Sequence, residues 1–218
     1  MSEASSELAK KYLDAVLTGD RREALRLIVE DGLQQGIAVP DLHLNVIQAA
    51  QYEIGRLWQE NRLSVAQEHL ATAVSQLVLS HLYHHLPKAP SNGKRVLVSC
   101  VQGEQHEVGV RILADFLEMA GFQVQLLGAN VPTDSLVAMV KQARPDLVAL
   151  SASLSFHLPA LRQAVARVRE VTGPSFPILV GGRAVLWAAG IEEQLGVPPA
   201  AKDAWGMVEA ARALLKVN

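Results

Sequence analysis

The sequence predicts an α/β protein in two parts: an N-terminal four-helix bundle, followed by a flavodoxin-like (Rossmann-type) domain with a five-stranded parallel sheet. The first observation is the period of the apolar residues. It is helical before residue 87 and changes to alternating short runs and amphipathic helices after residue 94. The second is the intervening segment, which reads PKAPSNGK and is rich in turn formers. We therefore expect a helical domain over 1–86, a linker over 87–93 and an α/β domain over 94–218.

Four stripes of apolar residues at helical spacing predict the bundle, because short connections between amphipathic helices favour antiparallel neighbours. Gly19 ends the first helix. Asp20 with Glu23, and Ser64 with Gln67, have the spacing of capping boxes that open the second and fourth helices. The residues expected to face the core are Leu8, Tyr12, Val16 and Leu17 in the first helix, Ala24, Leu27, Ile28 and Leu33 in the second, Val46, Ile47, Ala50, Ile54, Leu57 and Trp58 in the third, and Leu70, Ala73, Val74, Leu77, Val78 and Leu82 in the fourth.

Short apolar runs, each followed by an amphipathic helix, predict the parallel sheet, since strands covered on both faces read as near-continuous apolar segments. The expected strands are 95–100, 123–127, 147–151 and 178–180, with a weak fifth strand near 199–201. The expected helices run from about 106 to 120, 131 to 143, 158 to 172 and 204 to 217. Ligands of such a sheet bind at the carboxyl ends of its strands, so a site is expected in the loops there.

The composition narrows the function classes. Half of the 218 residues are hydrophobic, enough for a packed core, and 20 basic and 22 acidic side chains leave a net charge of −2. A near-neutral chain without a helix-turn-helix pattern is not equipped to bind nucleic acid directly. The single cysteine, Cys100, excludes an internal disulfide framework and a cysteine-built zinc site. The N-terminus does not resemble a signal peptide and no apolar run reaches the roughly 18 residues of a membrane helix, so we expect a soluble, cytoplasmic protein.

The turn after the first expected strand carries Glu104, His106 and Gly109 in the pattern Glu-x-His-x-x-Gly. It lacks the glycine spacing of a dinucleotide-binding loop. A carboxylate two residues from a histidine can accept a hydrogen bond from one ring nitrogen and leave the other nitrogen to ligate a metal. On this local pattern alone, a histidine that is merely solvated in a polar loop is the simpler interpretation.

The wider spacing resembles the signature of cobalamin-binding domains. From the glycine of this loop, 41 residues lead to Ser151-Ala-Ser153, and 27 more lead to Gly181-Gly182. The resemblance implies that His106 is the lower cobalt ligand, with the cofactor's own dimethylbenzimidazole displaced. It also implies that the displaced nucleotide tail enters a slot lined by the two serines and the two glycines. Glycine suits such a slot because a missing side chain lets a bulky ligand lie against the backbone.

Two positions depart from the commoner form of this signature. Glu104 stands where aspartate is commoner, and Ser153 stands where many members have leucine. Neither departure removes the expected ligand. His157 follows in the loop after Ser153, and a contact between it and the cofactor is left open.

The helical half resembles the cap of CarH-type adenosylcobalamin photoreceptors. Trp58, at the end of the third expected helix, is followed ten residues later by Glu68-His69, at the start of the fourth. The resemblance implies that Trp58, Val65, Glu68 and His69 line the adenosyl, or upper-ligand, pocket. Gln59 stands where the best-known photoreceptors have a histidine that ligates cobalt after illumination, which leaves His69 as the candidate upper ligand after loss of the adenosyl group.

These resemblances imply a light-sensing regulatory protein and not an enzyme. Adenosylcobalamin would lie base-off and His-on between bundle and sheet, and photolysis of its cobalt–carbon bond would move the bundle and change an oligomer or partner interface. Without a DNA-binding domain, we expect a transcriptional regulator or other signalling protein as the partner, and a light- or ligand-dependent homo-oligomer. Two alternatives stay open: a non-photochemical cobalamin-binding adaptor or antirepressor, and a corrinoid methyl-carrier subunit of a methyltransferase. Hydroxo- or methylcobalamin would then replace adenosylcobalamin.

Overall fold

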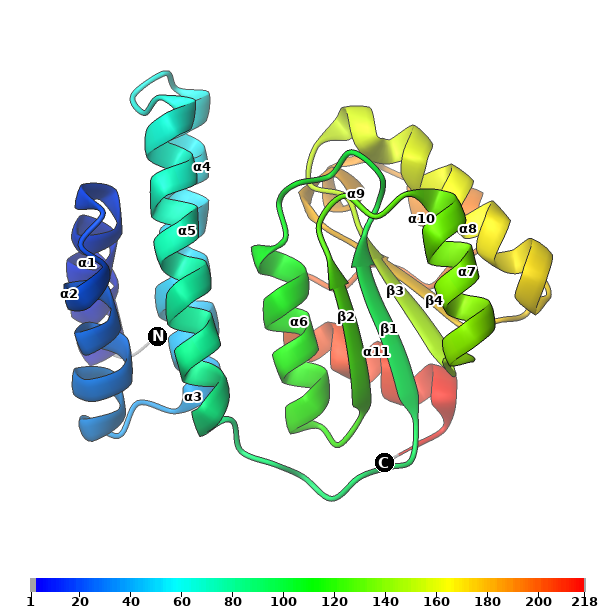
Figure 1. Ribbon diagram of the computed structural model, residues 1–218, viewed down its shortest axis with the longest axis horizontal. Coiled ribbons are helices and arrows are strands. Elements are labelled where there is room, and N and C mark those ends of the chain that lie inside the picture. The colour runs from blue at the N-terminus through cyan, green and yellow to red at the C-terminus, as the bar shows by residue number, and fades with distance from the viewer. Residues whose placement is uncertain (1–2, 218) are drawn as a thin grey trace. The chain divides into compact units, whose positions relative to one another are not determined.

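The computed structural model describes residues 3–217. The described chain divides between Pro87 and Lys88 into two compact parts, a helical unit and an α/β unit, coloured blue to cyan and green to red in Figure 1. Every helix in residues 3–217 is too short or too polar to span a lipid bilayer.

The helical unit is the expected four-helix bundle. Its helices, within the described residues, are α1 (Glu3–Thr18); α2 (Arg21–Leu25) continued by η1 (Arg26–Gly32); α3 (Val39–Asp41) continued by η2 (Leu42–Gln48) and α4 (Ala49–Gln59); and α5 (Val65–Leu82), followed by a 3-10 turn, η3 (Tyr83–His85). The segments η1 and η2 are π-helical, so the second and third helices each contain a widened stretch. α1 packs against α4 and α5, and α2 packs against α5.

A buried polar contact ties three of these helices together. The Tyr12 hydroxyl of α1 is buried and donates to Ser75 Oγ of α5 at 2.9 Å. Gln51 of α4 donates to the same oxygen from its Nε2 at 2.8 Å. Burial raises the pKa of Tyr12 well above its usual range, so its hydroxyl keeps its proton and remains a donor.

One stripe of the bundle core was predicted incorrectly. Leu70 and Ala73 of α5 are exposed, whereas Ala71, Ser75 and Leu79 of the same helix are buried. α5 carries apolar residues around most of its circumference, so spacing alone does not identify the face that packs inward.

The predicted helix starts are confirmed at one position and half formed at the other. Ser64 Oγ accepts from the Gln67 N–H at 3.3 Å, and Gln67 Oε1 accepts from the Ser64 N–H at 2.9 Å, which completes a capping box. Asp20 accepts from the Glu23 N–H at 3.0 Å. The Glu23 carboxylate itself is held by Arg26, so only the Asp20 half of that box forms.

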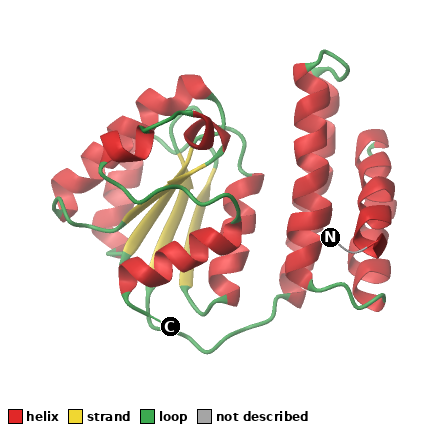
Figure 2. Ribbon diagram, turned by 180° about the vertical axis from the view of Figure 1, so that it is seen from behind, coloured by secondary structure: helices red, strands yellow, loops and turns green. Residues whose placement is uncertain are grey.

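The α/β unit is built on a parallel sheet in the order β2-β1-β3-β4. Its elements are β1 (Arg95–Cys100), α6 (Val108–Met119), β2 (Gln123–Gly128), α7 (Thr133–Ala143), β3 (Leu147–Ser151), η4 (Ser155–His157), α8 (Leu158–Thr172), β4 (Ile178–Gly181), α9 (Arg183–Trp187), α10 (Ile191–Leu195) and α11 (Ala204–Leu215). The sheet lies between helical layers (Figures 1 and 2): α6 contacts α11, and α7 contacts α8. This is the start of the flavodoxin-like strand order.

The predicted fifth strand is wrong. Within residues 3–217 the sheet has the four strands above, and residues 199–201 run as irregular chain into α11. Pro198 and Pro199 lack the backbone N–H that a sheet ladder requires, which explains why this segment does not pair. The helix expected from about residue 106 begins at Val108, so His106 belongs to the preceding loop.

Candidate functional site

The carboxyl ends of β1, β3 and β4 lie side by side. Cys100 is the register partner of Ser151, and Ser151 is the register partner of Gly181. The loops after these strands therefore leave the sheet at one edge. These strand ends, their loops and the first turn of α6 carry all the site residues that were predicted in the α/β unit.

A buried carboxylate organises this edge. The Glu104 side chain is fully buried, and its Oε1 accepts from the His106 backbone N–H at 2.9 Å and from His106 Nδ1 at 2.5 Å. Its Oε2 accepts from the backbone N–H groups of Ser153, at 2.6 Å, and Leu154, at 3.2 Å, and from His157 Nδ1 at 2.9 Å. One side chain thus joins the loop after β1 to the loop after β3.

These hydrogen bonds fix the charge of Glu104 and the tautomer of His106. Burial by itself raises the pKa of Glu104, but the bonds from His106, His157 and the Ser153 N–H outweigh it and hold this pKa at about 2. An ionised carboxylate can only accept, so Nδ1 of His106 carries a proton, and in the neutral ring Nε2 then carries the lone pair. The His106 side chain is 43% exposed, so the ring is presented at the surface of the α/β unit.

The loop that carries His106 is also anchored to the end of β2. The Glu104 carbonyl accepts from the Asn130 N–H at 2.8 Å, and the Asn130 side chain accepts from the Gly103 N–H at 2.8 Å. The Glu107 carboxylate accepts from the Ala129 N–H at 3.0 Å. Bonds on both sides of His106 therefore hold its backbone in place.

Cys100 is not suited to bind a metal. It is fully buried at the end of β1. Burial, together with the negative charges of Glu104 and Glu107, raises the pKa of its thiol to about 12. The thiol therefore stays protonated at neutral pH, whereas metal ligation needs the thiolate.

The three glycines of the predicted site differ in what surrounds them. A Cβ atom added at Gly109 would meet no atom within 4 Å, and one at Gly181 would make an ordinary contact of 3.6 Å with Met207 Cε. Gly182 has a φ of +96°, and its Cβ would lie 2.3 Å from the Ala152 carbonyl oxygen. The chain's own packing requires a glycine at residue 182, whereas it leaves space for a Cβ atom at the other two positions.

The two serines contribute in different ways. Ser151 is buried at the end of β3, and its Oγ would lie 2.9 Å from a Cβ added at Gly182. Ser153 donates to Glu104 through its backbone N–H. A leucine at this position could make the same bond, which explains why the departure at Ser153 does not affect the way His106 is held.

The remaining predicted residues belong to the helical unit. Trp58 is partly buried near the end of α4, and Val65, the first residue of α5, is 53% exposed. The Glu68 carboxylate accepts from the Thr72 hydroxyl at 2.9 Å and lies 3.5 Å from His69 Nε2. The His69 side chain is 72% exposed. The turn at residues 60–64 brings these residues to one end of the bundle.

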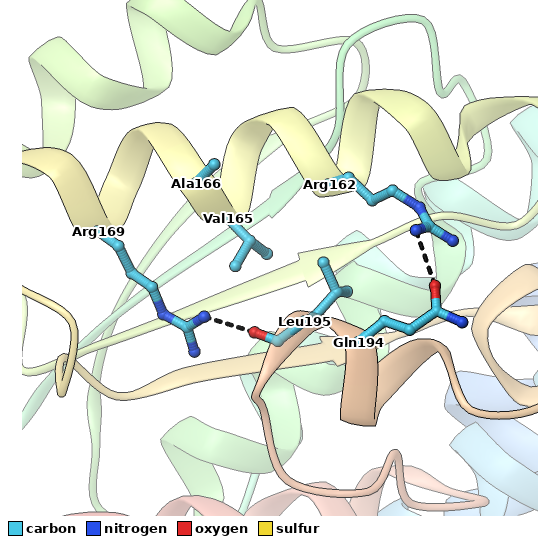
Figure 3. Close-up of a pocket in the computed structure, with 6 residues that line it drawn as sticks. All are labelled: Arg162, Val165, Ala166, Arg169, Gln194 and Leu195. Atoms are coloured by element: carbon cyan, nitrogen blue, oxygen red, sulfur yellow. Dashed lines mark hydrogen bonds between the residues drawn. The ribbon is translucent and has the colours of Figure 1, made fainter.

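A separate cavity of about 260 Å³ lies between α8 and α10 and contains none of the predicted site residues (Figure 3). Its two arginines hold the chain around it. Arg169 donates to the carbonyls of Leu195 and Gly196 at the end of α10, and Arg162 donates to Gln194 at 2.8 Å. These bonds give both arginines a structural role.

Comparison with known families agrees with this geometry. A family model described as "B12 binding domain" matches residues 94–197, and a second with the same description matches residues 8–83. Together they cover most of the chain, which therefore belongs to the B12-binding domain proteins and binds a cobalamin.

Two kinds of relative are similar to this chain. The HTH-type transcriptional repressor CarH of Myxococcus xanthus is 35% identical over 146 residues, 66% of this chain and 48% of the repressor, so the chain spans about half of that protein. Trimethylamine corrinoid protein 1 of Methanosarcina acetivorans is 25% identical over 218 residues, 97% of this chain and 99% of that protein. The structure of the Methanosarcina barkeri monomethylamine corrinoid protein has the same fold, with a TM-score of 0.82 at 19% identity over 96% of this chain and 98% of that one.

His157 is the site residue that sequence reasoning left without a role. It lies 53 positions from Glu104 and meets it only because β1 and β3 are neighbours in the sheet. The one sequence signal for this residue is its position soon after the serine motif, and that position does not identify Glu104 as its hydrogen-bond partner.

Changing Gly109 to alanine is expected to separate stability from cofactor binding. Alanine favours helix over glycine by up to about 1 kcal/mol, so the protein without cofactor should melt at an equal or higher temperature. The new Cβ would enter open space in the turn after His106, so cobalamin affinity, measured by absorption titration, should fall. Gly109→Leu should weaken binding further. Unchanged affinity in both variants would mean that the ligand does not occupy this space.

Proposed function

We propose that this protein is a cobalamin-dependent light sensor with His106 as the lower cobalt ligand. The observation that carries the ligand assignment is the hydrogen bond from His106 Nδ1 to Glu104 Oε1. This bond places a proton on Nδ1, so the neutral ring carries its lone pair on Nε2, the state that a cobalt ligand needs before the cofactor arrives. Binding is then base-off and His-on, because the imidazole takes the place of the cofactor's own base. The resemblance of Trp58, Glu68 and His69 to the cap of CarH-type photoreceptors supports the light-sensing part.

The nucleotide tail is assigned to the edge of the sheet beside this loop. Ser151 and Gly181 are the last residues of β3 and β4, and Ser153 and Gly182 follow them, at the edge where parallel sheets bind ligands. Gly181 supports this assignment, since the chain's own packing leaves space for a side chain there. Ser151 offers a hydroxyl at the same level of the sheet.

The upper face of the cofactor is assigned to Trp58, Val65, Glu68 and His69. When bound, adenosylcobalamin supplies a cobalt–carbon bond that visible light breaks. The apolar surfaces of Trp58 and Val65 are suited to pack on the adenosyl group, and both become more exposed to water when that group leaves. This difference in contacts is what would drive a change in the oligomer or in a partner interface. His69 is the candidate ligand for the vacated position.

The output of such a sensor would pass through another protein. The similarity to the repressor CarH supports a transcriptional regulator, or another signalling protein, as the partner. A change in self-association between light and dark is the second form of output that we propose. A non-photochemical adaptor or antirepressor would use the same cobalamin site without the light step.

A second candidate function is that of a corrinoid carrier in a methyltransferase system. The similarity to trimethylamine corrinoid protein 1 over nearly the whole of both chains favours it. A carrier needs an upper face that partner enzymes can reach, and the exposure of Val65 and His69 is compatible with such access. Methylation of the bound, reduced corrinoid by a methyltransferase, without any response to light, would support this candidate.

The test is to load the full chain with adenosylcobalamin in the dark and record the absorption spectrum and elution volume before and after green light. The light sensor predicts a His-ligated spectrum, an irreversible spectral change and a change in apparent mass. Trp58→Ala should still bind cobalamin but lose the change in mass, because the contact with the adenosyl group is gone. Tyr52→Ala removes an exposed aromatic ring from the same helix and should respond like the unchanged protein.

Three outcomes would contradict parts of this proposal. A light response that survives Trp58→Ala would exclude Trp58 from the switch. Tight binding without any change in mass would favour the carrier or the adaptor. If His106→Ala binds cobalamin with an unaltered spectrum, His106 is not the ligand.

A further inference from the structure

A series of hydrogen bonds leads from Glu68 into the core of the helical unit. The Thr72 hydroxyl, one turn further along α5, donates to Glu68 Oε1 at 2.9 Å and to Gln51 Oε1 of α4 at 3.1 Å. Gln51 Nε2 donates in turn to Ser75 Oγ at 2.8 Å, the oxygen that also accepts from the buried Tyr12 hydroxyl. The Glu68 side chain, at the outer end of this series, is 16% exposed. A residue assigned to the upper face of the cofactor is therefore connected to the contact between α1, α4 and α5.

The Thr72 hydroxyl has two acceptors and one proton. A hydroxyl donates a single hydrogen bond, and the carboxylate oxygen of Glu68 and the amide oxygen of Gln51 can only accept. Glu68 and Gln51 therefore compete for the same proton. Whenever Thr72 donates to one of them, the other loses this bond, and a partly buried oxygen that loses its donor is unfavourable.

We propose that Thr72 is a positioning residue whose single proton couples the hydrogen bonding of Glu68 to the packing of α4 against α5. A donor that binds Glu68 from outside draws its negative charge away from Thr72, so Thr72 donates more to Gln51. Gln51 is then held at both ends, by Thr72 and by Ser75, and α4 is tied more firmly to α5. The hydroxyls of an adenosyl group are donors of this kind. The inference rests on the proposed function in one respect, that the upper ligand lies at Glu68.

The competition can be tested without the cofactor by a double-mutant cycle in the full chain. Glu68→Ala and Gln51→Ala each leave Thr72 one of these acceptors, whereas the double variant leaves it neither. The unfolding constant of the helical unit is measured in urea by hydrogen exchange of the α4 and α5 segments. Its increase in the double variant should exceed the product of the two single increases by at least about twofold. The lost bond between Gln51 and Ser75 occurs in both arms of the cycle and cancels.

Repeating the cycle in two further backgrounds shows whether Thr72 carries this coupling. The coupling should disappear in Thr72→Val, which has the shape of threonine without the hydroxyl, and persist in Thr72→Ser, which keeps the hydroxyl. The matched control combines Gln51→Ala with Glu60→Ala. These two changes should be additive, because the donor that holds Glu60 at the surface is Arg56 and not Thr72.

Additive effects of Glu68→Ala and Gln51→Ala would overturn the inference. Additivity is the result expected if the Gln51 amide is rotated by half a turn, because Nε2 would then donate to Thr72 and the two acceptors would not compete. A coupling that persists in Thr72→Val would overturn the inference as well. If Thr72→Val does not fold, Thr72→Ala takes its place, since alanine is the best helix former.

The loaded protein separates this inference from the proposed function. With adenosylcobalamin in the dark, the amides around Gln51, two turns before Trp58, should exchange more slowly than with methylcobalamin, whose methyl ligand has no donor. Thr72→Val should reduce this difference, and Thr72→Ser should keep it. If the cycle shows the coupling but the two cobalamins give equal exchange, the competition for the Thr72 proton stands and the upper ligand does not lie at Glu68. A difference of the same size in Thr72→Val would exclude Thr72 from the coupling.

Discussion

Replacing Glu104 with glutamine is expected to destabilise the α/β unit by about 2–4 kcal/mol, because buried donors left without an acceptor cost about 1–3 kcal/mol each. Five N–H groups bind this carboxylate, two at Oε1 and three at Oε2. Glutamine replaces one acceptor oxygen by an NH₂ group, which cannot accept, so at least two of these donors lose their partner.

The same substitution should impair cobalt ligation. If the amide NH₂ faces His106, the ring can respond only by moving its proton to Nε2, which removes the lone pair assigned to cobalt. The fraction of cobalamin bound in the His-on form should therefore fall, as measured by the nitrogen coupling in the paramagnetic resonance spectrum of bound cob(II)alamin.

The stability effect is measured by urea denaturation of the full chain, read by hydrogen exchange of the β1 and β3 segments so that unfolding of the helical unit does not contribute. Glu170→Gln is the matched control, since Glu170 pairs with Arg167 at the exposed surface of α8. Surface ion pairs contribute up to about 1 kcal/mol to stability, so the free energy of unfolding of the control should fall by less than that. If Glu104→Gln loses no more stability than Glu170→Gln, the hydrogen-bond network around Glu104 is not formed in solution.

The second large effect is expected at Gly182. Its Cβ would lie 2.3 Å from the Ala152 carbonyl oxygen, which belongs to the backbone and cannot rotate away, and its φ of +96° is strained for any L side chain. Backbone strain of this kind costs about 1–3 kcal/mol, and the clash adds to it. We expect Gly182→Ala to lose at least about 3 kcal/mol of stability, which places it among the more severe point substitutions.

The adjacent glycine should behave differently. Gly181→Ala makes an ordinary contact with Met207 Cε, so its stability should change by less than about 1 kcal/mol. If the nucleotide tail lies against Gly181, the same variant should bind cobalamin more weakly, as measured by absorption titration. Normal binding by Gly181→Ala would place the tail elsewhere. Equal stability losses in the two variants would contradict the difference in packing between these glycines.

Much of the fold could be predicted because its signals are local. The capping box of Ser64 and Gln67 involves residues three apart. Three of the four observed strands, β1, β3 and β4, are short, mainly apolar runs, and β2 alternates glutamine with apolar residues before Gly128. The errors occurred where a local signal was ambiguous or a neighbour overrode it. α5 is apolar on more than one face, and Pro198 and Pro199 remove donors from a segment that otherwise resembles a strand.

For the site, the sequence by itself determined the pairing of Glu104 with His106. A carboxylate two positions from a histidine can bind its Nδ1 across a short loop, and the serine and glycine motifs follow strands that the apolar pattern locates. Only the tertiary structure decided what else binds that carboxylate. His157 and the N–H groups of Ser153 and Leu154 reach Glu104 because β1 and β3 pair side by side, which brings residues about 50 positions apart within hydrogen-bonding distance. A hydrogen bond depends on distance in space, and strand order, which local patterns do not encode, sets that distance.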